Sequence, residues 1–495
     1  MRRLAAMLVS LALGSVCLGA PRLVTLPGKS PIVSFRIVFT AGSASDPAGQ
    51  AGVANLTAEM LAQGGTREMP YRLIVDAMFP MATSVSATVD KEMTTFIAET
   101  HVENLEKFYR LFRAMLLEPG WGKEDLERVR DNTINYLRVS LRGNNDEELA
   151  KEGLYNLLYA GQPYGHENAG SVSDLKKLTL EDLERFYRAN LTQANLIIGI
   201  AGGYPSDFPE RLKKDFESLP EGDADTHPER VKLPEPAPIE HNRATIIQKD
   251  TRSVAYSLGY PIDVKRGDPD YPALLVMQSY FGPHRLQGHL YERMRETRGL
   301  NYGDYAYIEY FPRGMFQFEP DPNLSRHRQI FQIWIRPVEP PTAVFALRLA
   351  MYELDKLLKD GIAPADFERT RAFATKYVNI LTKTKSAELG YAIDSLYYGI
   401  PDYNSYVKTS LAKLTVDDVN RAIKKHLRPD RVQIVAVAKD AEGLRSKLVS
   451  GEASPMTYNS PKPEEIMKED KIVEKWPIDL RPGDIQIVPV EKIFE

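Results

Sequence analysis

Two groups of residues carry side chains whose types and spacing could do chemistry. In the first group, Asn55, Ala58 and Glu59 are three and four residues apart, so a helix would place them on one face. Only Glu59 offers a good metal ligand, because an amide binds zinc poorly and an alanine side chain binds nothing. A catalytic zinc needs three protein ligands, so this face alone cannot hold one.

The second group is Arg295 with Tyr302. The local pattern predicts that Arg295 ends a helix, that residues 298–300 turn the chain, and that Tyr302 begins a strand. A guanidinium and a phenol both donate hydrogen bonds and could converge on a peptide carbonyl or its oxyanion. The alternative is that Arg295 pairs with Glu292 or Glu296 on the helix surface while Tyr302 packs in the core.

Hydrophobic periodicity predicts the elements that must position the first group. Val53, Leu56, Met60 and Leu61 fall on one apolar stripe, which predicts an amphipathic helix within Gly52–Thr66. Glu59 lies off this stripe and is expected to be a solvated helix residue.

Apolar and β-branched runs predict the neighbouring elements. The predicted strands cover residues 22–25 and 32–40, joined as a hairpin, 85–88 and 93–100, joined around Asp90-Lys91, and 196–201. The predicted helices cover residues 101–117, 123–141, 146–159 and 180–189.

The chain then repeats itself. Leu178–Leu183 has its counterpart in Leu414–Val419, and Leu196–Ala201 has its counterpart in Val432–Val437. Each half has strands, then helices, then a strand. This order predicts an α+β fold of two homologous domains, each a mainly antiparallel sheet packed against a layer of helices.

Prolines between residues 219 and 240 indicate an extended linker between the halves. The predicted organisation is a signal peptide at 1–20, a first domain at 21–218, the linker at 219–240, a second domain at 241–440 and a C-terminal extension at 441–495.

The first twenty residues have the pattern of a secretory signal peptide, with two arginines, an apolar run and a small-residue end. The only cysteine, Cys17, lies within it, so the mature chain would form no disulfide. We expect a soluble protein exported to the periplasm or an extracellular space, without a transmembrane segment. A retained membrane anchor is the less favoured alternative.

Composition excludes several classes of function. The formal net charge is −4, with 43% hydrophobic and 26% charged residues, and the sequence has no basic stripe and no phosphate loop. Nucleic acid is therefore not an expected partner. His284 and His289 have no acidic third ligand in a convincing frame, so we expect surface or packing roles. The tyrosines of residues 302–310 predict a core-packed aromatic strand, with a peptide-binding wall as the alternative.

The helix around Asn55 resembles the zinc helix of the insulinase/pitrilysin-type peptidases, the inverzincins, whose signature is H-x-x-E-H. Here the two His positions hold Asn55 and Glu59, and the Glu position holds Ala58. The family's third ligand, a Glu on a later helix, falls near Tyr136. The resemblance implies that this chain has lost the zinc site, so that neither zinc nor any other cofactor is expected on it.

The second half carries a sharper resemblance to the same family. Residues 288–302 are similar to the motif S-R-L-F-x-x-L-R-E-x-R-G-L-x-Y, with Gly288-His289 in place of Ser-Arg. In the family, the Arg and the Tyr of this motif bind the substrate carbonyl beside the zinc. The resemblance carries that role to Arg295 and Tyr302. Gln162-Pro163-Tyr164-Gly165 resembles the family's H-P-Y-G, again without its His.

In the family's two-chain enzymes, one chain keeps the zinc motif and the other keeps the Arg/Tyr pair. The resemblance implies that this chain is the second kind. Its expected partners are a zinc-bearing insulinase-family homologue, which carries the zinc, and a peptide or unfolded polypeptide substrate. Two alternatives remain: a proteolytically inactive structural subunit of a larger complex, and an active protease with unusual ligands.

Overall fold

The computed structural model describes residues 20–222, 233–282, 288–312 and 319–495. The predicted signal peptide, apart from Ala20, lies outside these residues, as does the middle of the predicted linker. Within these ranges, no helix combines the length and the apolar composition needed to cross a bilayer.

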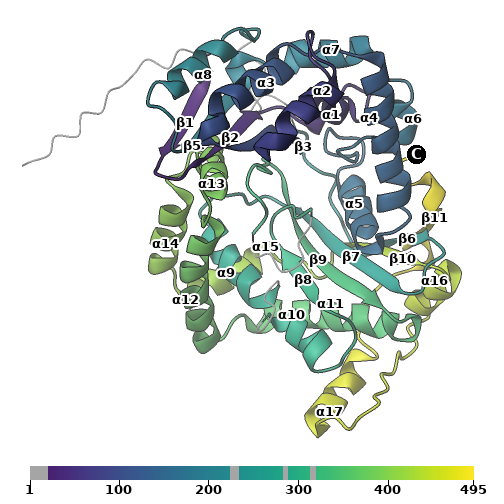
Figure 1. Cartoon of the computed structure of the whole chain (residues 1–495). Coiled ribbons are helices and arrows are strands. Elements are labelled where there is room, and N and C mark those ends of the chain that lie inside the picture. The colour runs from purple at the N-terminus through teal and green to yellow at the C-terminus, as the bar shows by residue number, and fades with distance from the viewer. Residues whose placement is uncertain (1–19, 223–232, 283–287, 313–318) are drawn as a thin grey trace, which may run out of the picture.

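The first half is built on a five-stranded sheet in the order β1-β5-β2-β4-β3 (Figure 1). Its strands are β1 (Arg22–Pro27), β2 (Ile32–Phe39), β3 (Val85–Val89), β4 (Thr94–His101) and β5 (Leu196–Gly202). Only β1 and β5 run parallel, and the other neighbours are antiparallel. The predicted pairing of β3 with β4 is confirmed, and β3 forms an open edge of the sheet.

The predicted hairpin of β1 with β2 is wrong. The strand β5 lies between them, in parallel register with β1 and antiparallel register with β2. Every residue of β5 is buried, so this strand needs a neighbour on each side to satisfy its backbone. Residues 28–31 connect β1 to β2 across β5, a distance of two strand spacings of about 4.8 Å each.

The second half repeats this topology. Its sheet has the order β11-β6-β10-β7-β9-β8, which is the order of the first sheet with one strand added. The strands are β6 (Arg243–Gln248), β7 (Val254–Ile262), β8 (Asp304–Tyr307), β9 (Gln329–Val338), β10 (Gln433–Ala438) and β11 (Ile485–Pro489). The predicted α+β fold of two homologous, mainly antiparallel units is confirmed.

Helices follow in matching order in the two halves. Those of the first half are α1 (Val53–Gln63), α2 (Tyr71–Met78), α3 (Leu105–Leu117), α4 (Lys123–Asn135), α5 (Asp146–Leu158), α6 (Val172–Leu175), α7 (Leu180–Asn190) and α8 (Phe208–Phe216). Those of the second half are α9 (Tyr271–Phe281), α10 (His289–Tyr291), α11 (Ala343–Asp360), α12 (Pro364–Leu381), α13 (Lys385–Tyr398), α14 (Tyr403–Lys413), α15 (Val416–His426), α16 (Ala441–Ser450) and α17 (Glu464–Val473). The chain also has short 3-10 turns and two π-helical turns, η4 (Tyr136–Leu141) and η8 (Glu292–Glu296).

The repeat extends to the caps of equivalent helices. Thr179 and Asp182 form a capping box at the start of α7, and Thr415 with Asp418 does the same for α15. Each threonine hydroxyl accepts from the backbone N–H three residues on, while the aspartate reaches back. The predicted counterpart segments therefore begin their helices with the same chemistry.

Each half covers the other half's sheet with one helix (Figure 1). The helix α5, from the first half, packs against β7, β9 and β10 of the second sheet, where a Cβ on Gly153 would lie 3.5 Å from Val435 Cγ1. Its counterpart α13 packs on β1, β2 and β5, with Leu389 and Ile393 in one buried cluster with Val38. The two halves therefore share their cores.

A buried polar contact joins the halves at the turn between β3 and β4. Arg326 Nε donates to Asp90 Oδ2 over 2.6 Å, and both side chains are almost fully buried. The guanidinium also lies 3.5 Å from the centre of the Tyr310 ring. Beside it, Glu92 accepts from the backbone N–H of His327 over 2.9 Å. The predicted turn at residues 90–91 is thus an inter-half contact.

We predict that Arg326→Ala lowers the free energy of unfolding by roughly 3–5 kcal/mol, because it leaves Asp90 buried without its cation. Lys439→Ala is the matched control. It removes an ion pair with Asp250 in which both side chains are exposed, and it should change stability by less than about 1 kcal/mol. Urea unfolding of the purified chain measures both. Equal losses in the two variants would contradict the assignment of Asp90–Arg326 as an inter-half lock.

Candidate functional site

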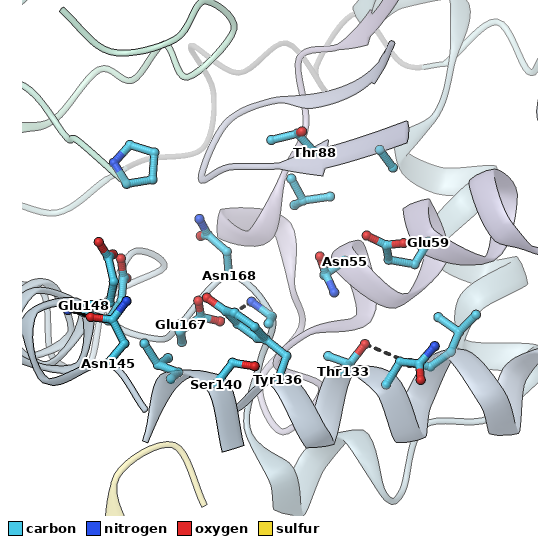
Figure 2. A pocket seen from close by; sticks show the side chains of 18 of the residues that line it. Asn55, Glu59, Thr88, Thr133, Tyr136, Ser140, Asn145, Glu148, Glu167 and Asn168 are labelled. Carbon is cyan, nitrogen blue, oxygen red and sulfur yellow. Dashed lines mark hydrogen bonds between the residues drawn. The ribbon is translucent and has the colours of Figure 1, made fainter. Parts of the chain in front are cut away.

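A cavity of about 560 Å³ lies beside the degenerate zinc helix. Asn55 and Glu59 project into it from α1, and Tyr136 faces them from the first residue of η4 (Figure 2). The edge strand β3 forms another wall, and Tyr310 reaches the cavity from the second half. Three of the four residues predicted from the zinc motif are thus brought together. The fourth, Ala58, is buried in the helix packing and does not line the cavity.

The side chains at this place do not fit a zinc ion. Asn55 offers an amide and Tyr136 a phenol, and Ala58 offers no base for a metal-bound water. Among the four positions of the zinc motif, Glu59 carries the one carboxyl, and it accepts a hydrogen bond from Gln63 on the next turn of α1. Burial raises the pKa of Glu59, which disfavours the charged form that a metal needs. Among the described residues, no group of three or more His, Cys, Asp or Glu side chains could hold a metal ion.

Glu59 is not the freely solvated residue that the sequence predicts. It is half-buried in the cavity wall, and its pKa is raised by desolvation. Periodicity placed it correctly off the apolar stripe. The wall that faces it, from β3 and η4, comes from later segments that a helix pattern does not contain.

The cavity wall is acidic. Four carboxyl groups line it, and no Lys, Arg or His stands among its described lining residues. The four are Glu59, Glu148, Glu152 and Glu167. Burial raises the pKa of Glu152 to about 7 and that of Glu167 to about 8. Tyr310 Oη donates to Glu152 over 3.2 Å, so the second half contributes to the wall. Sequence reasoning identified Glu59 but missed the other three carboxyls, because they share no motif.

Arg295 and Tyr302 do come together, but away from this cavity, which neither residue lines. Arg295 lies in η8, its Cζ is 5.8 Å from the centre of the Tyr302 ring, and its Nη1 donates to Tyr302 O over 3.5 Å. The Tyr302 residue is 74% exposed, so the alternative that it packs in the core is wrong. The alternative for Arg295 is partly right, since its Nε lies 3.7 Å from Glu296 Oε1.

The prediction that Tyr302 begins a strand is also wrong, because β8 starts at Asp304. Asn301 holds residues 301–304, just before and at the start of β8, in a turn. Its Nδ2 donates to Asp304 Oδ1 over 2.8 Å, and its Oδ1 accepts from Gly303 N over 3.1 Å. Gly303 has a φ of 141°, which a residue with a side chain rarely adopts. This turn projects Tyr302 outward, beyond the end of the strand.

Asp304 and Asn301 are site-supporting residues that sequence reasoning missed. Asp304 is buried, and burial raises its pKa to about 8. Asn301 Nδ2 also donates to Arg336 O over 3.1 Å, which ties the turn to the neighbouring strand β9. An Asn two residues before a Gly is a turn signal, and it could have indicated the break before β8.

The remaining predicted residues have packing roles. His289 Nε2 lies 2.8 Å from Glu353 Oε2, and its ring stacks on Tyr280, in line with a packing histidine. His284 lies outside the described residues. Tyr305 and Tyr307 are buried in an aromatic cluster, which confirms the core reading of the strand.

Comparisons with known proteins decide the family. Residues 24–171 match the model described as insulinase (peptidase family M16), and residues 177–373 match the model described as peptidase M16 inactive domain. The chain belongs to the insulinase family. The zinc helix lies in the part that matches the insulinase model, and there Asn55, Ala58 and Glu59 stand at the positions of the family's H-x-x-E-H signature.

Individual relatives are distant but span most of the chain. It is 21% identical to the non-peptidase homolog YmxG of Helicobacter pylori, over 80% of this chain and 86% of that protein. It is 23% identical to the zinc protease PqqE of the same organism, over 55% of this chain and 61% of that protein. A crystal structure of a protease from H. pylori matches with a TM-score of 0.73 at 17% identity, over 85% of this chain and 97% of that one, which shows a shared fold.

We predict that the purified M16 chain binds no stoichiometric zinc, because only one of its four motif positions carries a usable ligand. Restoring the motif with Asn55→His, Ala58→Glu, Glu59→His and Tyr136→Glu should give about one zinc per chain. Metal analysis after dialysis against zinc measures both proteins. One tightly held zinc in the unaltered chain, lost in Glu59→Ala, would contradict the prediction.

Proposed function

We propose that this chain is the non-zinc subunit of a heterodimeric insulinase-family metallopeptidase. The observation that carries the proposal is the pairing of half-buried Arg295 with exposed Tyr302, in a chain whose own zinc helix lacks its ligands. A guanidinium and a phenol that face outward can donate to a substrate carbonyl held at another chain's zinc. The family relationship supports this division of roles between two chains.

The cavity beside α1 supports a peptide as the bound molecule. The strand β3 is the open edge of its sheet, and three of its residues line the cavity. An extended peptide can add to such an edge through main-chain hydrogen bonds, while its side chains enter the adjoining space. Because the wall presents carboxyls, and the pKa values of Glu152 and Glu167 are raised to about 7 and about 8, peptides whose side chains donate hydrogen bonds to a carboxyl, such as lysine, are the favoured guests.

The second candidate is a proteolytically inactive structural subunit of a larger complex. The shared cores and the Asp90–Arg326 lock favour it, since both make the chain a stiff body. An acidic cavity and an outward-facing Tyr302 have no use in a pure scaffold, so we prefer the peptidase subunit. In either case, the basic and apolar start of the sequence supports an exported, periplasmic or extracellular protein.

A heterodimer is the first testable consequence. Co-expression of this chain with a zinc-bearing M16 homologue from the same organism should give a 1:1 complex in size-exclusion chromatography with light scattering. The complex is expected because this chain supplies the carbonyl donors and the homologue supplies the metal. A chain that elutes alone beside every such homologue would sink the proposal.

The second consequence concerns the pair itself. Arg295→Ala or Tyr302→Phe should lower cleavage of a lysine-containing fluorogenic peptide by the complex about 100- to 1000-fold, as for loss of an oxyanion donor. Tyr302 is 74% exposed and the Arg295 side chain 35% exposed, so melting temperature and complex formation should stay nearly unchanged. Steady-state kinetics at fixed complex concentration measures the effect.

The matched control for Arg295 is Arg369→Ala on α12, an exposed arginine that pairs with the neighbouring Asp366 and whose loss should leave the cleavage rate unchanged. A second control is Arg295→Lys, which keeps the charge but loses the planar fork and should not restore the rate. If both Arg295→Ala and Tyr302→Phe complexes cleave at the full rate, the structural subunit becomes the better reading.

A further inference from the structure

The segment after α16 runs past both candidate sites. It passes α17, then adds β11 to the outer edge of the second sheet in parallel register with β6, and finally reaches the first half (Figure 1). Arg348 of α11 holds the start and the return of the α17 loop, since it donates to Ser454 Oγ over 3.0 Å and to the backbone carbonyls of Glu452 and Glu474. We call residues 451–495 the strap.

One end of the strap grips the turn that carries Arg295. Glu469 and Asp470 of α17 face two arginines that flank Arg295 in sequence. Arg298 Nε donates to Asp470 Oδ1 over 2.9 Å, and Arg298 Nη2 donates to Glu469 Oε2 over 2.7 Å. Arg293 pairs with Glu469 as well, and its Nε donates to the fully buried Glu353 over 2.7 Å.

This contact also fixes the backbone of the turn. Arg298 is buried, and its Nη1 donates to Arg293 O over 3.0 Å, a carbonyl within η8. The turn is π-helical, a form that single turns adopt at functional positions and that leaves carbonyls without regular partners. Asp470 therefore positions the Arg298 side chain, which in turn bonds the backbone of η8.

The other end of the strap grips the turn that carries Tyr136. Arg138 Nη2 lies 2.8 Å from Glu495 Oε1, and Arg142 Nη2 lies 3.1 Å from Glu495 Oε2. Arg142, the residue after η4, also donates from Nη1 to Glu491 O over 2.8 Å. Phe494 O accepts from Val172 N of α6 over 3.0 Å. The two arginine contacts hold η4, the π-helical turn that faces Asn55 and Glu59 across the cavity.

We propose that the strap sets the geometry of both site-bearing π-helical turns, with Glu469 and Asp470 as positioning residues for Arg295 and Tyr302. Within the described residues, the strap binds both of the turns that have π geometry. The role assigned to Arg295 and Tyr302 rests on the proposed function. The positioning of their turn does not.

The first test uses the isolated full chain. Glu469→Gln, alone and with Asp470→Asn, should speed amide hydrogen exchange of residues 289–303 about tenfold or more, measured by mass spectrometry. Glu464→Gln is the matched control, since it removes an exposed ion pair with Lys468 on the same helix and should leave that exchange unchanged. Glu469→Asp keeps the carboxylate and should restore part of the protection.

A separate variant tests the other end of the strap, at η4. Glu495→Gln should speed exchange in residues 136–142 and leave residues 289–303 unchanged. Unchanged exchange at residues 289–303 in both α17 variants, or a rise spread evenly over the second half, would overturn the proposal and leave α17 as ordinary packing.

A second readout separates positioning from stability in the complex with a zinc-bearing homologue. Glu469→Gln should lower kcat about tenfold with little change in KM, and it should cause no further loss in the Arg295→Ala background, because both act through one group. Additive losses would overturn the positioning role. If Glu469→Gln speeds amide exchange at residues 289–303 but the Arg295→Ala complex cleaves at the full rate, the positioning role of the strap is upheld and the proposed function is contradicted.

Discussion

The exchange of α5 and α13 between the two sheets is the constraint on which the structure depends. Each helix buries an apolar face against strands of the opposite half, and small residues permit the approach: Gly153 on α5 and Gly199 on β5, where a Cβ would lie 2.8 Å from Ile393 Cδ1. Protein interiors are close-packed, so neither half can shift without opening the other's core. The cavity beside α1 owes its closed side to this arrangement, because Tyr310 approaches it from the second half.

The sequence was informative about everything local. Apolar periodicity placed α1 and α3, and the repeat indicated two units, since equivalent segments have equivalent neighbours in both sheets. The predictions that failed concerned contacts between segments far apart in the sequence. The strand β5 lies between β1 and β2 although it follows them by some 150 residues, and no pattern within residues 22–40 contains that fact. The sequence also could not predict that α5 and α13 pack on the opposite half's sheet, because an apolar helix face does not specify which surface it covers.

The site shows the same division. A motif frame predicted that Asn55, Glu59 and Tyr136 would face one another, and the cavity contains all three. The acidic wall came from Glu148, Glu152 and Glu167, which only folding gathers. For Tyr302 the sequence erred by two residues, since Asn301 and Gly303 delay the strand. That small error reverses the side chain's environment, from packed core to open solvent.

The strand β11 has an effect on how copies of the molecule can associate. Unpaired strand edges template the addition of further strands, and uncontrolled addition leads to fibres. By lying along β6, β11 becomes the outer strand of the second sheet, so a strand arriving at this end would meet Ile485–Pro489 and not β6. A short edge strand that ends in proline is a poor template, because proline has no backbone N–H to donate. With β11 in place, this end of the second sheet therefore adds a further strand less readily than the longer β6 would.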